Sequence, residues 1–418
     1  KLDNHGSIFD YITLEATNLP SGWILSDDNL TTRITKNSSK NVNISVIAPQ
    51  YFPEGEYDIT IKGTSSRDSR EVSYANFTVI VLRYYDFDVD SSSNLTGLPR
   101  EVVDVEFYIT NQGNYWDRYY LEAYLDKDWT YNVADQTSII DPGETVSVLV
   151  TVFVPDKEYW QTTAQVQLNV TGGNYGTDDE FTKHNSTFVS VDLERRLSIS
   201  VDAPTKYQLP GETISYDITV ENIGNYEDNV SLDNNSLDDG WSQDLSTYFL
   251  NLDYLGSKTF QLNVNIGENA YVNDNFGSIV TVTSDGDSDV EIDIGATTYA
   301  LQYASVDIVN PSDVVEEPYR EVIFIFEIYN SGNGPDSFNI EGHSSGNWTF
   351  QMDKDITIEL DRFETDYVEV IVSVPAGTPV DTIDTFTITA VSLFDSTIID
   401  GNQNHGWEHH FVFGMPIN

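Results

Sequence analysis

The sequence predicts an all-β fold made of tandem β-sandwich domains arranged as a rod, and three observations support this. A motif of the form Asn-x-Gly-x-x-x-Asp occurs four times at nearly even spacing along the chain. The segments around it alternate apolar and polar residues with the period of two that is typical of half-buried strands. No stretch shows helical periodicity, and the roughly seven short strands per period are typical of a β-sandwich.

The repeat follows from two markers that stay in step. The motif begins at Asn4, Asn111, Asn222 and Asn330, so the intervals between its copies are nearly equal. Each copy ends on an Asp, and a Trp follows at an almost constant distance, giving the pairs Asp10 and Trp23, Asp117 and Trp129, Asp228 and Trp241, Asp336 and Trp348. We therefore expect four domains, called here repeats 1 to 4, over residues 1–86, 87–193, 194–300 and 301–418.

Repeat 2 shows the expected elements most clearly. A strand before the motif should place Val103, Val105, Phe107 and Ile109 in the core, and a Pro-Gly-Glu turn at 142–144 leads into a second alternating strand over 146–154. Asn and Gly tolerate positive φ, so we expect the motif to form a loop with positive φ between two strands. The motif Asp should bind backbone N–H groups of that loop, and the Trp should fill the space between the sheets.

The motif, the Trp, the Pro-Gly-Glu turn and the Val-x-Val-x-Val-Pro strand together resemble the Ig-like repeats associated with some α-galactosidases. They also resemble the CARDB-type adhesion repeats of bacterial and archaeal surface proteins. The resemblance covers nearly the whole chain and is best in repeat 2, whereas repeats 3 and 4 depart from it at the turn, with Tyr254-Leu255-Gly256-Ser257 and Arg362-Phe363-Glu364. It implies an extracellular Ig-like module that serves as spacer, stalk or adhesion unit, and it carries over no catalytic residue.

The segments that join the repeats indicate stiffness. Residues 189–203 and 297–309 contain no Gly or Pro, unlike flexible linkers. Repeat 1 opens at the motif itself, so we expect its first two strands to be missing and the gap to be filled by upstream residues of a longer chain or by a strand of another subunit. The chain opens without a signal peptide, which favours a mature form or a fragment.

Charge and composition exclude some kinds of partner. The 418 residues include 68 Asp and Glu against 20 Lys and Arg, a net charge of -48, so a nucleic-acid partner is excluded by repulsion and anionic membrane surfaces are disfavoured. The acidic surface fits a solubilising shell in high salt, and the alternative is a cation-binding surface. Cysteine is absent, and no long apolar run predicts a direct membrane span.

Glycosylation is predicted from ten Asn-x-Ser/Thr sequons. These favour an extracellular or cell-surface glycoprotein that carries N-linked glycans. They lie at Asn29, Asn37, Asn43, Asn76, Asn94, Asn169, Asn185, Asn229, Asn234 and Asn347.

Candidate metal sites are few. The one segment suited to Ca²⁺ carries Asp285, Asp287 and Asp289 at alternate positions, with a solvated hairpin turn as the alternative. No other cofactor is indicated. Six scattered His residues fall in no nucleophile or metalloprotease motif, so we expect no enzymatic activity.

One strand breaks the pattern of polar outer faces. In residues 320–329, Ile323, Ile325 and Tyr329 should point outward, at positions where repeat 2 carries Asp104 and Glu106. An apolar outer row indicates either a covered face or a tolerated apolar surface. We expect an interface here with copies of the same chain or with neighbouring surface proteins.

These observations favour an extracellular structural protein of an archaeal surface, a subunit or segment of a filament, S-layer-like coat or stalk. The alternative is an adhesin, or a non-catalytic spacer or carbohydrate-contacting module of a carbohydrate-active enzyme.

Overall fold

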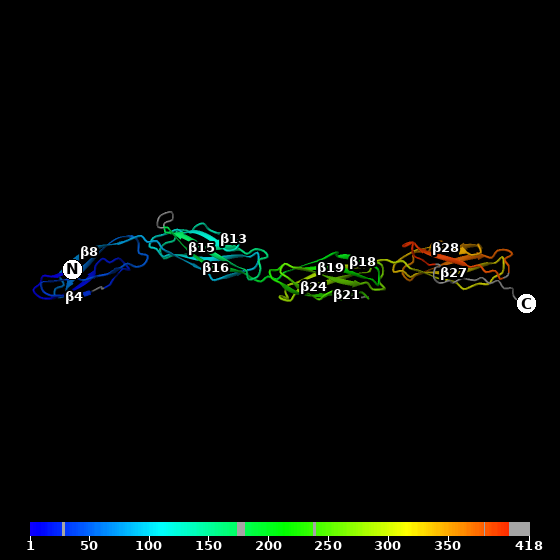
Figure 1. The fold of residues 1–418 in the computed structure, drawn as a ribbon, viewed down its shortest axis with the longest axis horizontal. Helices are drawn as coiled ribbons and strands as arrows, with labels where there is room; N and C mark the ends of the chain where they lie inside the picture. The colour runs from blue at the N-terminus through cyan, green and yellow to red at the C-terminus, as the bar shows by residue number, and fades with distance from the viewer. Residues whose placement is uncertain (27–29, 174–179, 237–239, 380, 401–418) are drawn as a thin grey trace. The chain divides into compact units, whose positions relative to one another are not determined.

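The computed structural model describes residues 1–26, 30–173, 180–236, 240–379 and 381–400, and the described residues form strands and no helix (Figure 1). The fold is thus all-β, as predicted. The chain divides into two compact units, Lys1–Glu194 and Arg195–Asn418. Each unit contains two separate hydrophobic cores, one for each predicted repeat. No helix long and apolar enough to cross a membrane occurs in this described part of the chain.

Repeat 2 is a β-sandwich of two four-stranded sheets. One sheet has the order β13-β14-β11-β9 and the other the order β10-β16-β15-β12. All pairings are antiparallel except that of β10 with β16, which is parallel. The strands are β9 (Phe87–Ser91), β10 (Leu95–Gly97), β11 (Val102–Asn111), β12 (Tyr120–Leu125), β13 (Thr130–Val133), β14 (Thr145–Phe153), β15 (Thr163–Gly172) and β16 (Phe181–Val191).

The predicted strand faces of repeat 2 are confirmed. Val103, Val105, Phe107 and Ile109 of β11 are all buried in its core. In the other sheet, alternate residues of β15 are likewise buried in the core, because successive side chains of a strand point to opposite faces. The four motif-linked tryptophans are also buried, each immediately before a short strand.

Repeat 3 has the same plan. Its sheets have the orders β17-β19-β23-β21 and β18-β25-β24-β20-β22, and β18 with β25 is again the parallel pair. The strands are β17 (Leu197–Val201), β18 (Thr205–Gln208), β19 (Thr213–Asn222), β20 (Asp228–Asn234), β21 (Ser242–Leu245), β22 (Phe249–Leu252), β23 (Ser257–Asn265), β24 (Asn275–Ser284) and β25 (Glu291–Ala300).

Repeat 4 is described up to residue 400. Its sheets have the orders β26-β27-β30-β29 and β28-β31-β32. The strands are β26 (Val306–Val309), β27 (Glu321–Asn330), β28 (Phe338–Ser344), β29 (Thr349–Met352), β30 (Thr365–Ser373), β31 (Phe386–Ser392) and β32 (Ile399–Asp400).

Repeat 1 has one four-stranded sheet, of order β4-β2-β7-β8, and two short pairs, β1 with β5 and β3 with β6. Its core has only five buried residues, and many partly buried apolar side chains surround them. The strands are β1 (Leu2–Asn4), β2 (Asp10–Ala16), β3 (Ile24–Leu25), β4 (Leu30–Ile34), β5 (Ser38–Lys40), β6 (Val46–Ile47), β7 (Gly55–Ser65) and β8 (Val72–Val81).

The expected positive φ of the motif loop is wrong. No motif residue is among the described residues with positive φ. Positive φ occurs instead in the turn before the next long strand, at Gly143 of the Pro-Gly-Glu sequence and at the equivalent residues Leu255 and Phe363. The motif loop does not need a left-handed residue, because hydrogen bonds from side chains hold its shape.

Candidate functional site at the joints between repeats

The first Asn of the motif closes its own loop in the same way in all four copies. In repeat 4, the Asn330 side chain accepts a hydrogen bond from the Gly332 N–H at 2.9 Å. Its amide donates to the Gly334 carbonyl at 2.9 Å and to the Leu360 carbonyl at 2.8 Å. Asn4 and Asn111 make the equivalent bonds. Asn222 differs only in that its second amide bond goes to the Asp253 carbonyl, one residue beyond the equivalent position. Because an amide both donates and accepts, this one side chain satisfies three backbone groups that a loop would leave unpaired.

The motif Gly is required by close approach. A Cβ at Gly113 would lie 2.5 Å from the Tyr84 carbonyl oxygen, and one at Gly332 would lie 2.8 Å from the Tyr303 carbonyl oxygen. Tyr84 and Tyr303 belong to the segments that lead in from the preceding repeat. The missing side chain therefore lets the incoming chain pass directly over the motif loop.

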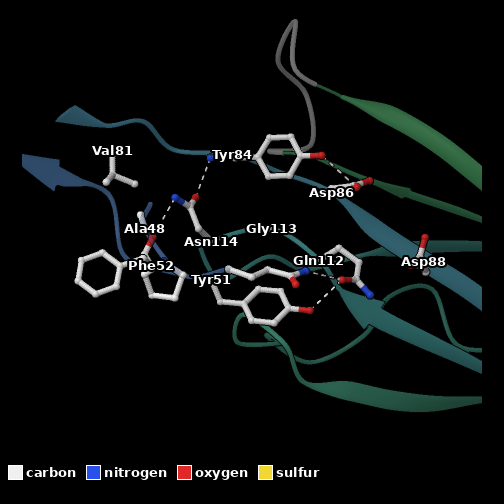
Figure 2. Close-up of a pocket in the computed structure, with 12 residues that line it drawn as sticks. Ala48, Tyr51, Phe52, Val81, Tyr84, Asp86, Asp88, Gln112, Gly113 and Asn114 are labelled. Atoms are coloured by element: carbon white, nitrogen blue, oxygen red, sulfur yellow. Dashed lines mark hydrogen bonds between the residues drawn. The ribbon is translucent and has the colours of Figure 1, made fainter. Parts of the chain in front are cut away.

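The second Asn of the motif fastens the joint between repeats 1 and 2. Asn114 Oδ1 accepts from the Tyr84 N–H at 2.7 Å, and its amide donates to the Leu82 carbonyl at 2.9 Å. The same amide donates to the Phe52 carbonyl of repeat 1 at 3.1 Å. Figure 2 shows Asn114 between the segment that carries Tyr84, which links β8 to β9, and the loop that carries Phe52. One side chain thus binds both the linker and a loop of the preceding repeat.

The joint between repeats 3 and 4 repeats this arrangement. Asn333 Oδ1 accepts from the Tyr303 N–H at 2.8 Å, and the Asn333 amide donates to the Leu301 carbonyl at 2.9 Å and the Ala270 carbonyl at 3.3 Å. Asn333 is fully buried. In addition, the Val272 N–H donates to the Asn333 carbonyl at 3.0 Å. The two joints that lie within a compact unit therefore use one design.

Further side chains form hydrogen bonds across the edge of each joint. In the first joint, the Tyr51 hydroxyl donates to Gln112 Oε1 at 2.8 Å and Gln50 donates to the same atom at 3.2 Å (Figure 2). These residues and Tyr84, Asp86 and Asp88 line an open pocket of about 370 Å³. Asp86 is engaged by Lys183, whose ammonium donates to it at 2.7 Å. Burial opposes ionisation of Asp86, but the hydrogen bonds from Lys183 and Tyr84 outweigh it and lower the pKa of the carboxyl.

In the joint between repeats 3 and 4, the rim contacts involve charged side chains. The Tyr271 hydroxyl donates to Asp361 Oδ1 at 2.6 Å, and this hydrogen bond lowers the pKa of Asp361. The Arg362 guanidinium donates to the Asn269 carbonyl at 2.7 Å. Asp361 and Arg362 lie in the turn of repeat 4 that departs from Pro-Gly-Glu, so this departure supplies contacts to the preceding repeat.

The motif Asp anchors a neighbouring hairpin as well as its own loop. Asp117 Oδ1 accepts from the Arg118 N–H at 2.8 Å, as expected, and Oδ2 accepts from the Gly173 N–H at the end of β15 at 2.8 Å. In repeat 3 the equivalent Asp228 instead pairs with the Arg195 guanidinium at 2.5 Å. The prediction that the Asp binds an N–H group of its loop is thus confirmed in repeat 2, but in repeat 3 the Asp binds Arg195 instead, and the second bond of Asp117 was not predicted.

The sequons differ in how available their amides are. Asn37, Asn43, Asn76, Asn94, Asn229 and Asn347 are exposed, whereas Asn169, Asn185 and Asn234 are half-buried. The Asn185 amide donates to the Val89 carbonyl at 2.8 Å, so a glycan on that nitrogen would replace a contact between strands. Asn29 lies outside the described residues.

The acidic segment proposed for Ca²⁺ forms the turn between β24 and β25. Asp285 accepts from the Ser231 hydroxyl at 2.5 Å, and Asp287 accepts from the Asp289 N–H at 3.1 Å. The three aspartates are exposed. Across the described residues, no group of three or more His, Asp or Glu side chains is arranged to hold a metal ion.

The predicted outer row of β27 faces outward. Ile323 and Ile325 are 57% and 55% exposed. Tyr329 is half-buried, and its ring stacks on that of Phe363 with centroids 6.3 Å apart. The neighbouring strand β30 places Tyr367 on the same face, where it is also exposed. These four apolar side chains form one outward surface.

The role of the second motif Asn was not predicted from the sequence. A signal was available, since Asn114, Asn225 and Asn333 occupy this position and Ser7 occupies it in repeat 1. The partners are 30 to 63 residues away in the sequence, so no local pattern identifies them.

No family model matches the chain, and no curated protein is significantly similar to it. Among solved structures, extracellular cadherin domains 1–5 of protocadherin gamma B2 are similar at 12% identity and a TM-score of 0.40, over 96% of this chain and 72% of that one. Cadherin domains 1–4 of PcdhgB3 reach a TM-score of 0.41 at 12% identity, over 96% and 92% of the two chains. Titin domains I67–I69 reach 0.33 at 10% identity, over 80% and 100%. Similarity at this level carries no information about function.

Proposed function

We propose that this chain is an extracellular structural protein, a subunit or segment of a glycosylated archaeal cell-surface filament, S-layer-like coat or stalk. Its repeats would then be of the α-galactosidase-associated or CARDB type that the sequence resembles. One observation carries the proposal: in both joints within the compact units, the second motif Asn fastens a repeat to the one before it. The most repeated feature of the sequence is thus used to join domains.

The chemistry of the joints supports a load-bearing role. A side-chain amide that donates twice and accepts once restrains the linker and the preceding repeat together, and each such bond contributes about 0.5–1.5 kcal/mol net. A binding site would instead leave polar groups facing solvent for a ligand. The bonds of Asn333 are all directed to backbone groups of its own chain.

Self-association would use the outward surface of repeat 4. Ile323, Ile325, Tyr329 and Tyr367 lie there, whereas the corresponding sheet face of repeat 3 is polar, with Ser215 and Asp217 on β19. The partner in this proposal is a copy of the chain or a neighbouring surface protein. Replacing both Ile323 and Ile325 by Asp should abolish ordered assembly, and Ile279→Asp, which alters an exposed isoleucine of repeat 3, should not.

Glycans should sit on the exposed sequons. Proteolytic peptide mapping of native material should find carbohydrate at several of Asn37, Asn43, Asn76, Asn94, Asn229 and Asn347, and none at Asn185, whose amide is engaged inside repeat 2. An intact mass equal to that of the bare polypeptide would contradict this part of the proposal.

Negative-stain microscopy of native material tests the assembly. Ordered filaments or a lattice are expected. Isolated particles that bind members of a glycan array would instead favour the alternative, an adhesin or a carbohydrate-contacting module.

A further inference from the structure

The joint between repeats 3 and 4 contains the only Asn-Gly pair of the sequence, Asn333-Gly334. The joint between repeats 1 and 2 has Asn114-Tyr115 at the same place. The glycine is imposed by the joint itself, because a Cβ on residue 334 would lie 2.6 Å from Cγ1 of Val272 in the preceding repeat. The asparagine that fastens this joint is therefore followed by a residue without a side chain.

Asn-Gly is the dipeptide in which asparagine, a thermolabile residue, loses its amide most readily. The backbone nitrogen of the glycine attacks Cγ of the asparagine, a C–N bond forms, and the side-chain nitrogen leaves as ammonia with the proton of the attacking N–H. Water then opens the resulting five-membered imide at one of its two carbonyl carbons, which leaves an aspartyl or an isoaspartyl residue. Glycine favours the attack because it offers no steric hindrance and has the widest choice of backbone conformations.

The closed joint suppresses this reaction in two ways. Asn333 is 1% exposed and Gly334 is buried, so the water that the second step consumes is kept away. The nitrogen that must leave donates to the Leu301 carbonyl at 2.9 Å and to the Ala270 carbonyl at 3.3 Å. Oδ1 of the same side chain accepts from the Tyr303 N–H at 2.8 Å. All three partners belong to the linker or to repeat 3, so these restraints are released when the joint opens.

The product of the reaction does not fit the closed joint. An aspartate at position 333 has no side-chain N–H to donate, and its carboxylate would face the two carbonyl oxygens that the amide bound, in a place without water. An isoaspartyl residue also adds a methylene group to the backbone, which displaces the motif loop from its partners. Both products therefore favour the open joint.

We propose that Asn333 is a site of spontaneous deamidation that releases the joint between repeats 3 and 4 irreversibly. The reaction proceeds when the joint opens, and its product keeps the joint open. Aged chains therefore accumulate a repeat 4 that is no longer fastened to repeat 3. The joint between repeats 1 and 2 should stay intact over the same time, because a tyrosine follows Asn114.

Peptide mapping of the full chain measures the reaction. The folded chain is kept at neutral pH and sampled over weeks, and fragment ions of the tryptic peptide 321–354 locate aspartate and isoaspartate at residue 333. The same chain in guanidinium chloride gives the rate of the unprotected pair. Asn333 should react in both, but at least about tenfold more slowly in the folded chain, because three hydrogen bonds hold it there. Asn114 should stay unmodified in the folded chain.

Tyr271→Phe separates opening of the joint from unfolding. The change removes the hydrogen bond from the Tyr271 hydroxyl to Asp361 across the joint, at 2.6 Å, and leaves the Asn-Gly pair untouched. Because the rate follows the population of open joints, deamidation of the folded chain should become about three- to tenfold faster. The matched control Tyr248→Phe removes a similar bond within repeat 3, to Asp244 at 2.7 Å, and should leave the rate unchanged.

Hydrogen exchange tests the product. The Val272 N–H donates to the carbonyl of residue 333 at 3.0 Å, and in the variant Asn333→Asp it should exchange roughly tenfold faster. The N–H of Val370, in a strand paired on both sides, should exchange as in the parent, because repeat 4 stays folded.

Three results would overturn the proposal. The first is deamidation of Asn333 at equal rates in the folded and denatured chains, or none in either. The second is an unchanged rate in Tyr271→Phe, and the third is unchanged exchange of the Val272 N–H in Asn333→Asp. These measurements use the unassembled chain, so their outcomes are independent of the filament or lattice proposed above.

Discussion

Removing the Asn333 side chain should loosen the joint between repeats 3 and 4 without unfolding either repeat. The Asn333→Ala variant loses three hydrogen bonds, to Tyr303, Leu301 and Ala270. At about 0.5–1.5 kcal/mol each, and with the freed backbone groups able to reach water once the joint opens, the loss is about 2–3 kcal/mol. Since about 1.4 kcal/mol is a factor of ten, the ratio of closed to open joints should fall roughly 30- to 150-fold.

The absence of cysteine makes the assay direct. Lys258→Cys and Glu369→Cys place two spin labels on exposed positions of repeats 3 and 4, and no native thiol competes. Pulsed electron paramagnetic resonance should give a narrow distance distribution for the parent and a broad one for Asn333→Ala. The matched control Asn251→Ala, an exposed asparagine of repeat 3, should keep the narrow distribution.

The result that refutes this reasoning is a distribution of unchanged width combined with a lower unfolding temperature. Asn333 would then stabilise the fold of repeat 4, and the joint would be held by other contacts.

Three further predictions follow from the loops and turns. Asn330→Asp should lower the free energy of unfolding of its repeat by about 3 kcal/mol, because it places a buried carboxylate against two carbonyl oxygens. Asn4→Asp, at a half-exposed position, should lower it less. Urea denaturation followed by Trp fluorescence shows which of the two variants loses more stability. Leu255→Gly should raise stability by about 0.5–1 kcal/mol by relieving a positive φ, and Leu255→Ala, which keeps the strain, should not, as thermal denaturation can show. Because the pKa of Asp361 is lowered, its hydrogen bond with Tyr271 stabilises the closed joint fully above the ordinary carboxyl pKa and is lost as the pH falls through the lowered value. The distribution of distances between the two labels should therefore broaden only in that acidic range. Tyr271→Phe should remove this pH dependence.

Much of the fold could be predicted because it follows from local pattern. The alternation of β11 determined its buried face, since a strand that has water on one side and a core on the other has only one stable orientation. The burial of Trp129 and its three counterparts followed from their nearly constant distance to the motif.

The joints could not be predicted in this way, because their bonds link residues of different repeats. Asn114 reaches Phe52 from 62 residues away. A periodic sequence shows what each copy shares, but it does not show which shared residue contacts the copy before it. The expectation of positive φ was wrong for a related reason. Asn and Gly are common in left-handed turns, but here the Asn side chain both donates and accepts hydrogen bonds, and the Gly leaves room for the backbone of the incoming segment.

The parallel pairing of β10 with β16, and of β18 with β25, has a mechanical consequence. In each pair, one strand lies near the start of its repeat and the other at the end, and both run in the same direction. Tension applied through the two ends of the repeat therefore pulls these strands in opposite senses and loads their hydrogen bonds in shear, all at once, instead of peeling them apart singly. Repeats 2 and 3 should accordingly resist stretching better than repeat 1, which has no such pair among its described strands.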